Sequence, residues 1–252
     1  MNIIVPIKVL ADDQDIVVAA DRSLDDSKAH RIVSTYDLNA IEAAVQLASA
    51  HADSKVVCVS VADAKADDSK LKKGILARGV DELVMIADDA CADLDAHATA
   101  AMLARLVDGL DAADLIVCGD GSADNYAQQV DVQLAAKLGL PVVTAATKIS
   151  ALDGALEVER TLEDVVEVVE VPLPAVVSVA PDIALPRIPG MKDILAAGKK
   201  PMNVAGAEGA YESSIEVVSC LAPKQADRKH EILEASADGA IQQFAAALKA
   251  AL

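Results

Sequence analysis

The sequence has few aromatic and few basic residues. One of its 252 residues is Phe, three are Tyr and none is Trp, and 22 Lys and Arg face 40 Asp and Glu for a formal net charge of −18. Nucleic acids and anionic membrane surfaces are bound through clustered Lys and Arg. The charge therefore argues against both as partners. A hydrophobic share of 53%, mostly Ala and Val, is still enough to build a core.

Cysteine and histidine do not form metal or disulfide patterns. The four cysteines are scattered without a CxxC pair, and Cys58 and Cys118 lie inside apolar runs, as buried reduced thiols do. The four histidines also lack metal-ligand spacing, so we expect no metal site. Residues 1–8 do not have the pattern of a signal peptide, and no apolar run approaches the ~18 residues of a membrane span. We expect a cytoplasmic protein.

Familiar catalytic and phosphate-binding motifs are missing as well. No GxGxxG follows the first apolar run, no GxxxxGK[ST] occurs, and no Ser-Gly-Gly loop opens the first helix. We find no nucleophile beside a base. The sequence thus favours ligand binding over catalysis by side chains.

Apolar patterning predicts an α/β protein. We expect buried strands at residues 3–9, 56–61, 83–86, 115–118 and from 141 onwards, which alternate with helices at 37–50, 65–78, 95–110 and 124–138. Such alternation gives a Rossmann-like parallel sheet with helices on both faces.

The pattern changes after residue 155. Residues 156–160 and 165–171 predict an antiparallel hairpin, followed by a strand at 175–180. Residues 181–201 are rich in proline and predict an exposed loop with a short helix at 191–195. We then expect a linker at 203–210, a strand at 215–221 and an amphipathic terminal helix at 238–252. This gives a domain of residues 1–221 and a C-terminal arm of 222–252.

The segment 115–136 is the strongest candidate for a binding site. It is an apolar run, a turn at Gly119-Asp120-Gly121, and then helical spacing, with polar side chains from Ser122 onwards. Unpaired amides at the start of a helix bind phosphate, and glycines let the backbone approach a ligand. The alternative is that Ser122 or Asp124 simply caps the helix. Ligands of parallel sheets bind at the carboxyl ends of strands, where residues 6–8, 60–62 and 119–130 would meet.

Residues 158–178 resemble the signature of the electron transfer flavoprotein beta subunit. The pattern runs from an apolar residue and Arg160, through clustered acids, to Pro174 and two aliphatics, with Val165 as a departure. Residues 5–8, 36–43 and 186–200 resemble its first strand, first helix and partner-recognition loop. Residues 37–42, 118–122 and 126–129 are most similar to the FixA branch of this family.

The resemblance implies a Rossmann-like fold of the adenine nucleotide alpha hydrolase type, with an antiparallel β extension and an arm that docks on an alpha subunit. In this family the alpha subunit holds the redox-active FAD. The beta subunit holds AMP, or a second FAD in members that bifurcate electrons from NADH. The further partner is a redox protein of the acyl-CoA dehydrogenase or quinone oxidoreductase type.

Carried over by position, the resemblance assigns two sets of residues. The adenine-nucleotide site is expected at Pro6, Ser34, Val61, Asp120, Ser122, Ala123, Asp124, Asn125, Gln128, Gln129 and Val130. The redox partner is expected to dock on the recognition loop 184–200 through Met191, Ile194 and Leu195. Two positions depart from the family: many members have Asn in place of Ser34, and a small or acidic residue in place of Tyr126. The departure at Tyr126 bears on how an FAD pyrophosphate would be placed.

A second function is compatible with the same strand–turn–helix segment. A regulatory protein of the universal stress type also binds an adenine nucleotide, but stands alone and dimerises through a sheet edge. That class has neither a proline-rich recognition loop nor a C-terminal arm, so these two segments favour the flavoprotein subunit.

Overall fold

The computed structural model describes residues 1–209, 213–225 and 230–251. They form two compact units. The first consists of Met1–Val17 and Asp25–Ser219, and the second of Val18–Leu24 and Cys220–Leu252.

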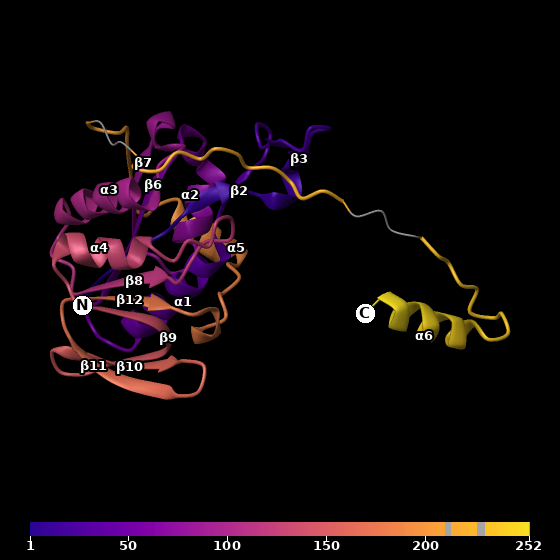
Figure 1. Cartoon of the computed structure of the whole chain (residues 1–252). Helices are drawn as coiled ribbons and strands as arrows, with labels where there is room; N and C mark the ends of the chain where they lie inside the picture. Colours follow the sequence, from indigo (N-terminus) through magenta and orange to yellow (C-terminus); the bar gives the residue numbers. More distant parts are fainter. Residues whose placement is uncertain (210–212, 226–229, 252) are drawn as a thin grey trace. The chain divides into compact units, whose positions relative to one another are not determined.

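A nine-stranded, mostly parallel sheet is the centre of the first unit (Figure 1). Its order is β11-β10-β9-β12-β8-β1-β6-β7-β13. The strands from β9 to β13 in this order pair in parallel, and β10 pairs antiparallel with both β9 and β11. The strands are β1 Asn2–Pro6, β6 Lys55–Ala62, β7 Glu82–Ala87, β8 Leu115–Gly119, β9 Val142–Ala151, β10 Ala155–Thr161, β11 Val166–Pro172, β12 Ala175–Val179 and β13 Met202–Ala205.

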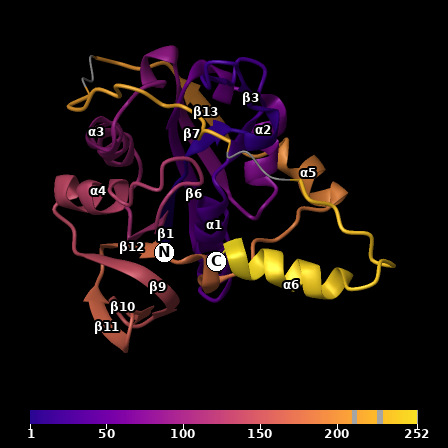
Figure 2. The same ribbon diagram turned by 45° about the vertical axis from the view of Figure 1, so that its right-hand side comes forward.

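Helices cover both faces of the sheet, as Figures 1 and 2 show. Helices α1 (Thr35–Ser49) and α2 (Ser69–Leu76) lie on one face, and α3 (Ala96–Asp108) and α4 (Val130–Leu138) on the other. Helix α5 (Met191–Ala197) packs beside α2. Successive strand residues point to opposite faces. Ile3 and Val5 of β1 therefore join the core under α1 and α2, while Ile4 joins the core under α3 and α4. The predicted α/β fold with helices on both faces is confirmed.

Short elements complete the N-terminal part. Strand β2 (Val9–Ala11) pairs antiparallel with β5 (Arg31–Val33), and β3 (Val17–Val18) pairs with β4 (Leu24–Asp25). Among the described residues, short 3-10 turns lie at Asp13–Asp15, Ala64–Ala66 and Asp89–Cys91, and another follows β12 at Pro181–Ile183. The predicted first strand, 3–9, is thus divided in two: β1 ends at Pro6, which has no N–H to donate.

Two segments near the end of the first unit differ from the prediction. Residues 203–210 were expected to be a linker, but β13 pairs with β7 from Met202 opposite Leu83 to Ala205 opposite Ile86. The pairing uses the backbone of an exposed edge strand, so it leaves no apolar pattern. Residues 215–221 were expected to be a strand, and that prediction is wrong. Their apolar side chains are exposed, and only Leu221 forms an isolated bridge, to Ser23.

The second unit holds the C-terminal helix. Helix α6 spans Ala240–Ala251, close to the predicted range, and exposes Ile241, Phe244 and Leu248 along one side. Within this unit the amide of Ala222 donates to the Arg22 carbonyl at 2.9 Å. No helix among the described residues has the length and apolar character needed to cross a membrane.

Two glycines near α2 should respond in opposite ways to replacement by alanine, one with a loss and one with a gain of stability. Gly79, just after α2, has a φ of +95°, and a Cβ there would lie 2.8 Å from a Val45 methyl. Gly74 is inside α2 with nothing within 4 Å of its Cβ position. We expect Gly79→Ala to lower the free energy of unfolding by about 1–3 kcal/mol, from backbone strain and crowding. Gly74→Ala should raise it by about 0.5–1 kcal/mol through helix propensity. Urea denaturation of the full chain measures both, and equal effects would contradict the assignment.

Candidate functional site

The sheet has a switch point between β1 and β8. The chain runs from β1 to β6 and β7 on one side, and then returns to place β8 on the other side of β1. In open parallel sheets, ligands bind at the carboxyl ends of strands beside such a point. The residues that leave β1 and β8 here are 7–8 and 120–129. The Ser60 hydroxyl, near the end of β6, donates to the Ile7 carbonyl at 2.9 Å, so all three segments expected from the sequence lie at this edge.

A buried carboxylate joins the ends of these two strands. Asp37, in the first turn of α1, is 5% exposed, and its Oδ2 accepts a hydrogen bond from the Lys8 amide at 2.6 Å. It also accepts one from the Gly119 amide. A Cβ at Gly119 would lie 2.6 Å from Asp37 Oδ1 and 2.9 Å from the Tyr36 backbone, so only glycine fits this approach. One side chain thereby fixes β1, β8 and α1 relative to one another.

Burial raises the pKa of Asp37 from 3.8 to about 7. The two amide hydrogen bonds and the Lys8 charge favour the ionised form and oppose this rise, while the nearby Asp124 adds to it. Loss of hydration is therefore the dominant influence on this carboxyl group.

Ser34 and Lys8 connect α1 to the loop after β8. The buried Ser34 hydroxyl accepts a hydrogen bond from the Ala123 amide at 3.3 Å, and the Ser34 amide donates to the Lys8 carbonyl at 2.9 Å. The Lys8 ammonium donates to both carboxylate oxygens of Asp124, at 2.6 and 2.8 Å. Burial alone would raise the pKa of Asp124, but the hydrogen bonds from Lys8 and Ser122 hold it below its usual value.

The loop 120–129 differs from the prediction. Helix α4 begins at Val130 rather than at residue 124. Tyr126 and Gln128 have φ values of +46° and +53°, which a right-handed helix does not allow. The amides of residues 122–125 are consequently not first-turn amides. The interpretation that they form a helix start against a phosphate is wrong, although the same residues still lie at the switch point.

Tyr126 fills part of this loop. Its ring lies against Gly121, where a Cβ would be 2.3 Å from the Tyr126 Cδ2 atom. Its hydroxyl donates to Asp120 Oδ2 at 3.2 Å and accepts from Gln128 Nε2 at 3.4 Å. The rings of Tyr126 and Tyr36 have centroids 5.1 Å apart. The other Asp120 oxygen is buried without a partner among the described residues, and burial raises the pKa of this group.

The structure brings together part of the expected set. Lys8 bonds to Ser34 through its carbonyl and to Asp124 through its ammonium, and Pro6 lies two residues before it. Ala123 joins this group through its bond to Ser34. Val61 lies on the next strand, two residues beyond Val59, which pairs with Pro6. The remaining residues follow along the loop and into α4: Asp120, Ser122, Asn125, Gln128, Gln129 and Val130.

Sequence reasoning missed the roles of Lys8 and Asp37. The signal for Lys8 was its position two residues after the first strand. For Asp37 no sequence signal separates a buried carboxylate from a solvated one in the first turn of a helix. The Lys8 ammonium suits the phosphate of a nucleotide. The fully buried Ser34 hydroxyl accepts from the Ala123 amide and so positions the loop beside Lys8. The unpartnered Asp120 oxygen suits a ligand hydroxyl or amino group.

A second candidate site is an exposed apolar segment, the residues 185–195. Leu185, Ile188, Met191 and Leu195 are 90, 93, 76 and 69% exposed, and Ile194 is 42% exposed. Exposed apolar groups at this density mark interaction surfaces. The expected docking residues Met191, Ile194 and Leu195 therefore all have side chains within reach of a partner.

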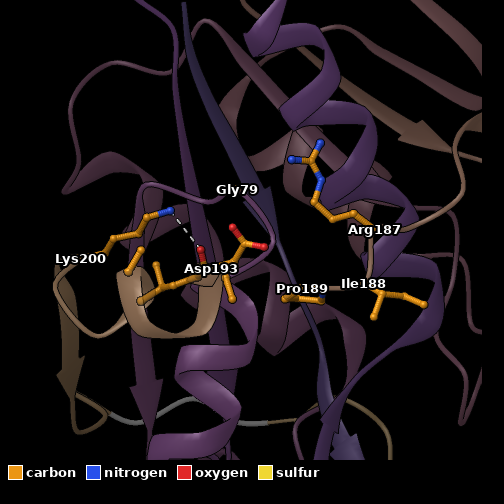
Figure 3. Close-up of a pocket in the computed structure, with 9 residues that line it drawn as sticks. Gly79, Arg187, Ile188, Pro189, Asp193 and Lys200 are labelled. Carbon is orange, nitrogen blue, oxygen red and sulfur yellow. Dashed lines mark hydrogen bonds between the residues drawn. The ribbon is translucent and has the colours of Figure 1, made fainter. Parts of the chain in front are cut away.

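The base of this segment is held by α1 and α2. Asn39 donates to the carbonyls of Pro181 and Ala184, at 3.0 and 2.8 Å. Arg187 forms a two-pronged ion pair with Glu42, at 2.7 and 3.0 Å, and its carbonyl accepts from Arg78. A cavity of about 150 Å³ is lined in part by this segment. Figure 3 shows the side chains that line it. Its wall includes Gly79, Arg187, Ile188, Pro189, Asp193 and Lys200.

The raised pKa of Asp37 gives a stability prediction with a definite sign. Between pH ~4, the ordinary pKa, and pH ~7 the folded chain binds more protons at Asp37 than the unfolded chain. Stability from this group is therefore full below pH ~4 and falls as pH rises to ~7. We expect the difference in free energy of unfolding between the wild type and Asp37→Asn to decline across that window. Urea titrations at several pH values measure it, and a constant difference would contradict the assignment.

Comparison with protein families agrees with these features. Residues 21–209 match the family model described as the electron transfer flavoprotein domain. The match runs from β4 to β13 and does not include β1. It includes the loop 120–129 and the exposed apolar segment. Proteins of this family associate with flavin or nucleotide and form alpha–beta heterodimers. The chain belongs to the electron transfer flavoprotein domain family.

Proposed function

We propose that this chain is the beta subunit of a heterodimeric electron transfer flavoprotein. The observation that carries this proposal is the Lys8 ammonium and the loop that Ser34 positions beside it at the switch point, in a chain that belongs to the family. The described residues of the second unit contain one helix, α6, and no parallel sheet. A single nucleotide-type sheet suits the subunit that holds an adenine nucleotide, and the redox-active FAD then belongs to the alpha subunit.

The proposed ligand of this site is AMP or a second FAD. We assign it to the residues expected from the resemblance: Pro6, Ser34, Val61, Asp120, Ser122, Ala123, Asp124, Asn125, Gln128, Gln129 and Val130. Ser34 supports these assignments indirectly, because its buried hydroxyl accepts from the Ala123 amide and so positions the loop of the site. The segments 37–42, 118–122 and 126–129 support membership of the FixA branch. A second FAD would extend the proposal to an electron-bifurcating enzyme that oxidises NADH.

The partner surfaces are assigned to two separate parts of the chain. We propose that the arm, residues 222–252, docks on the alpha subunit, and the exposed side of α6 supports this. The segment 184–200 then receives the redox partner, a protein of the acyl-CoA dehydrogenase or quinone oxidoreductase type. Residues 1–221 form the nucleotide-binding domain in this scheme. The free thiols, of which Cys58, Cys91 and Cys118 are buried, support a reducing compartment such as the cytoplasm.

Co-production with the alpha subunit tests the proposal directly. We expect the two chains to purify as a 1:1 complex, and mass spectrometry of the extracted ligands to identify FAD together with AMP, or FAD alone at about two per heterodimer. A stable chain that purifies alone without any nucleotide would overturn the proposal. Reduction of the bound flavin by NADH would identify the bifurcating case.

The exposed apolar segment gives a second test. Replacement of Met191 and Leu195 by Gln removes apolar contacts without disturbing the Glu42–Arg187 base. We expect the KM for the redox partner to rise about tenfold or more, since buried anchors dominate interface affinity. Turnover with a small artificial electron acceptor should stay unchanged, because such an acceptor needs no docking surface. Matched replacement of the exposed Val166 and Val168 on the hairpin is the control. An unchanged KM for the partner would contradict the assignment.

A further inference from the structure

The ion pair between Lys8 and Asp124 lies within the proposed nucleotide site. Lys8 follows β1 and Asp124 lies in the loop after β8, so the pair spans the two strand ends at the switch point. Its side chains are 42 and 36% exposed. An ion pair this accessible to water contributes little to stability. It can therefore be opened by a ligand at small cost.

The surroundings of this pair are strongly acidic. Asp37 and Asp131 are both buried, and Asp120 is partly buried in the same loop as Asp124. The negative charge of Asp124 already contributes to the raised pKa of the Asp37 carboxyl group. A phosphate carries up to two negative charges, and it would be repelled here unless a cation faces it. In the described loop and strand ends, the cation is the Lys8 ammonium, which pairs with Asp124.

A second nearby cation is already committed. The Arg31 guanidinium, on β5, is 8% exposed and pairs with Asp63 at 2.5 Å and with Asp26 at 3.0 Å. Two carboxylates therefore hold Arg31 within the protein. Lys8 differs because its single carboxylate partner sits on a loop, and because its long side chain is partly in water.

We infer that Lys8 is the residue of this site that binds the ligand's phosphate. When the ligand is absent, the Asp124 carboxylate pairs with the Lys8 ammonium in place of the phosphate. The carboxylate oxygens of Asp124 occupy the position around the ammonium that phosphate oxygens take on binding. Asp124 then turns away from Lys8, and its own carboxylate does not contact the ligand. This inference rests on the proposed function, and it gives Asp124 the role of a competitor rather than of a ligand contact.

Because Lys8 and Asp124 have opposing roles, substitutions at the two positions should change the AMP affinity in opposite directions. Lys8→Gln removes a charge-assisted hydrogen bond to phosphate, so AMP should bind about tenfold more weakly. Asp124→Asn removes the internal anion while it keeps the side-chain shape, so AMP should bind several-fold more tightly. Adenosine lacks the phosphate, and its affinity should not change in either variant. Lys8→Arg keeps the charge and should retain most of the AMP affinity.

Titration calorimetry of the full-length chain, freed of co-purifying nucleotide by dialysis against charcoal, tests this with AMP and adenosine. FAD and riboflavin form an equivalent pair of probes if the site prefers a flavin. The control is the ion pair of Lys148 and Glu159, 2.6 Å apart on the β9–β10 hairpin, where Lys148→Gln and Glu159→Gln should change neither affinity.

Three outcomes would overturn the inference. An equal loss of adenosine and AMP affinity in Lys8→Gln would show a structural role. Weaker AMP binding in Asp124→Asn would make Asp124 a ligand contact. Unchanged AMP binding in both variants would remove the pair from the site. If the wild-type chain binds none of the four probes, the proposed function fails as well, and that result is distinct from the other three.

Discussion

The hydrogen bonds accepted by the buried Asp37 carboxylate are the constraint on which the candidate site depends. They join the Lys8 amide at the end of β1 to the Gly119 amide at the end of β8, and they do so from the first turn of α1. A carboxylate taken out of water is costly unless donors satisfy it. Burial therefore raises the pKa of Asp37 even though two amides donate to it. Gly119 approaches Asp37 so closely that a side chain there would collide with the carboxylate.

Helix α1 connects the two functional regions of the domain. Its N-terminal residues hold the switch point, and its middle residues Asn39 and Glu42 hold the base of the exposed segment 185–195. Because one helix contacts both regions, the proposed nucleotide at the switch point would also stabilise the helix that holds the base of the exposed segment.

The loop 120–129 shows how local backbone geometry changes an interpretation without moving the site. Positive φ values at Tyr126 and Gln128 delay α4 to Val130, and the Tyr126 ring lies against Gly121. Unpaired amides at a helix start therefore do not form the candidate phosphate site. Lys8 after β1, Ser34 before α1 and the loop itself form it instead. The location at the carboxyl ends of β1 and β8 stays as expected.

The sequence by itself determined the class of fold, because period-2 and period-3.6 apolar patterns report directly on strands and helices. It also determined the exposed segment, whose prolines interrupt any regular pattern, and the family, whose motifs are continuous in the chain. Only the tertiary structure decided the delayed start of α4, the pairing of β13 with β7, and the partners of Asp37, Lys8 and Ser34. These features join residues distant in sequence, such as Lys8 and Asp124, and local patterns carry no information about such contacts. The sequence shows which side chains are charged, but the order of the strands in the sheet determines which charged groups pair with one another.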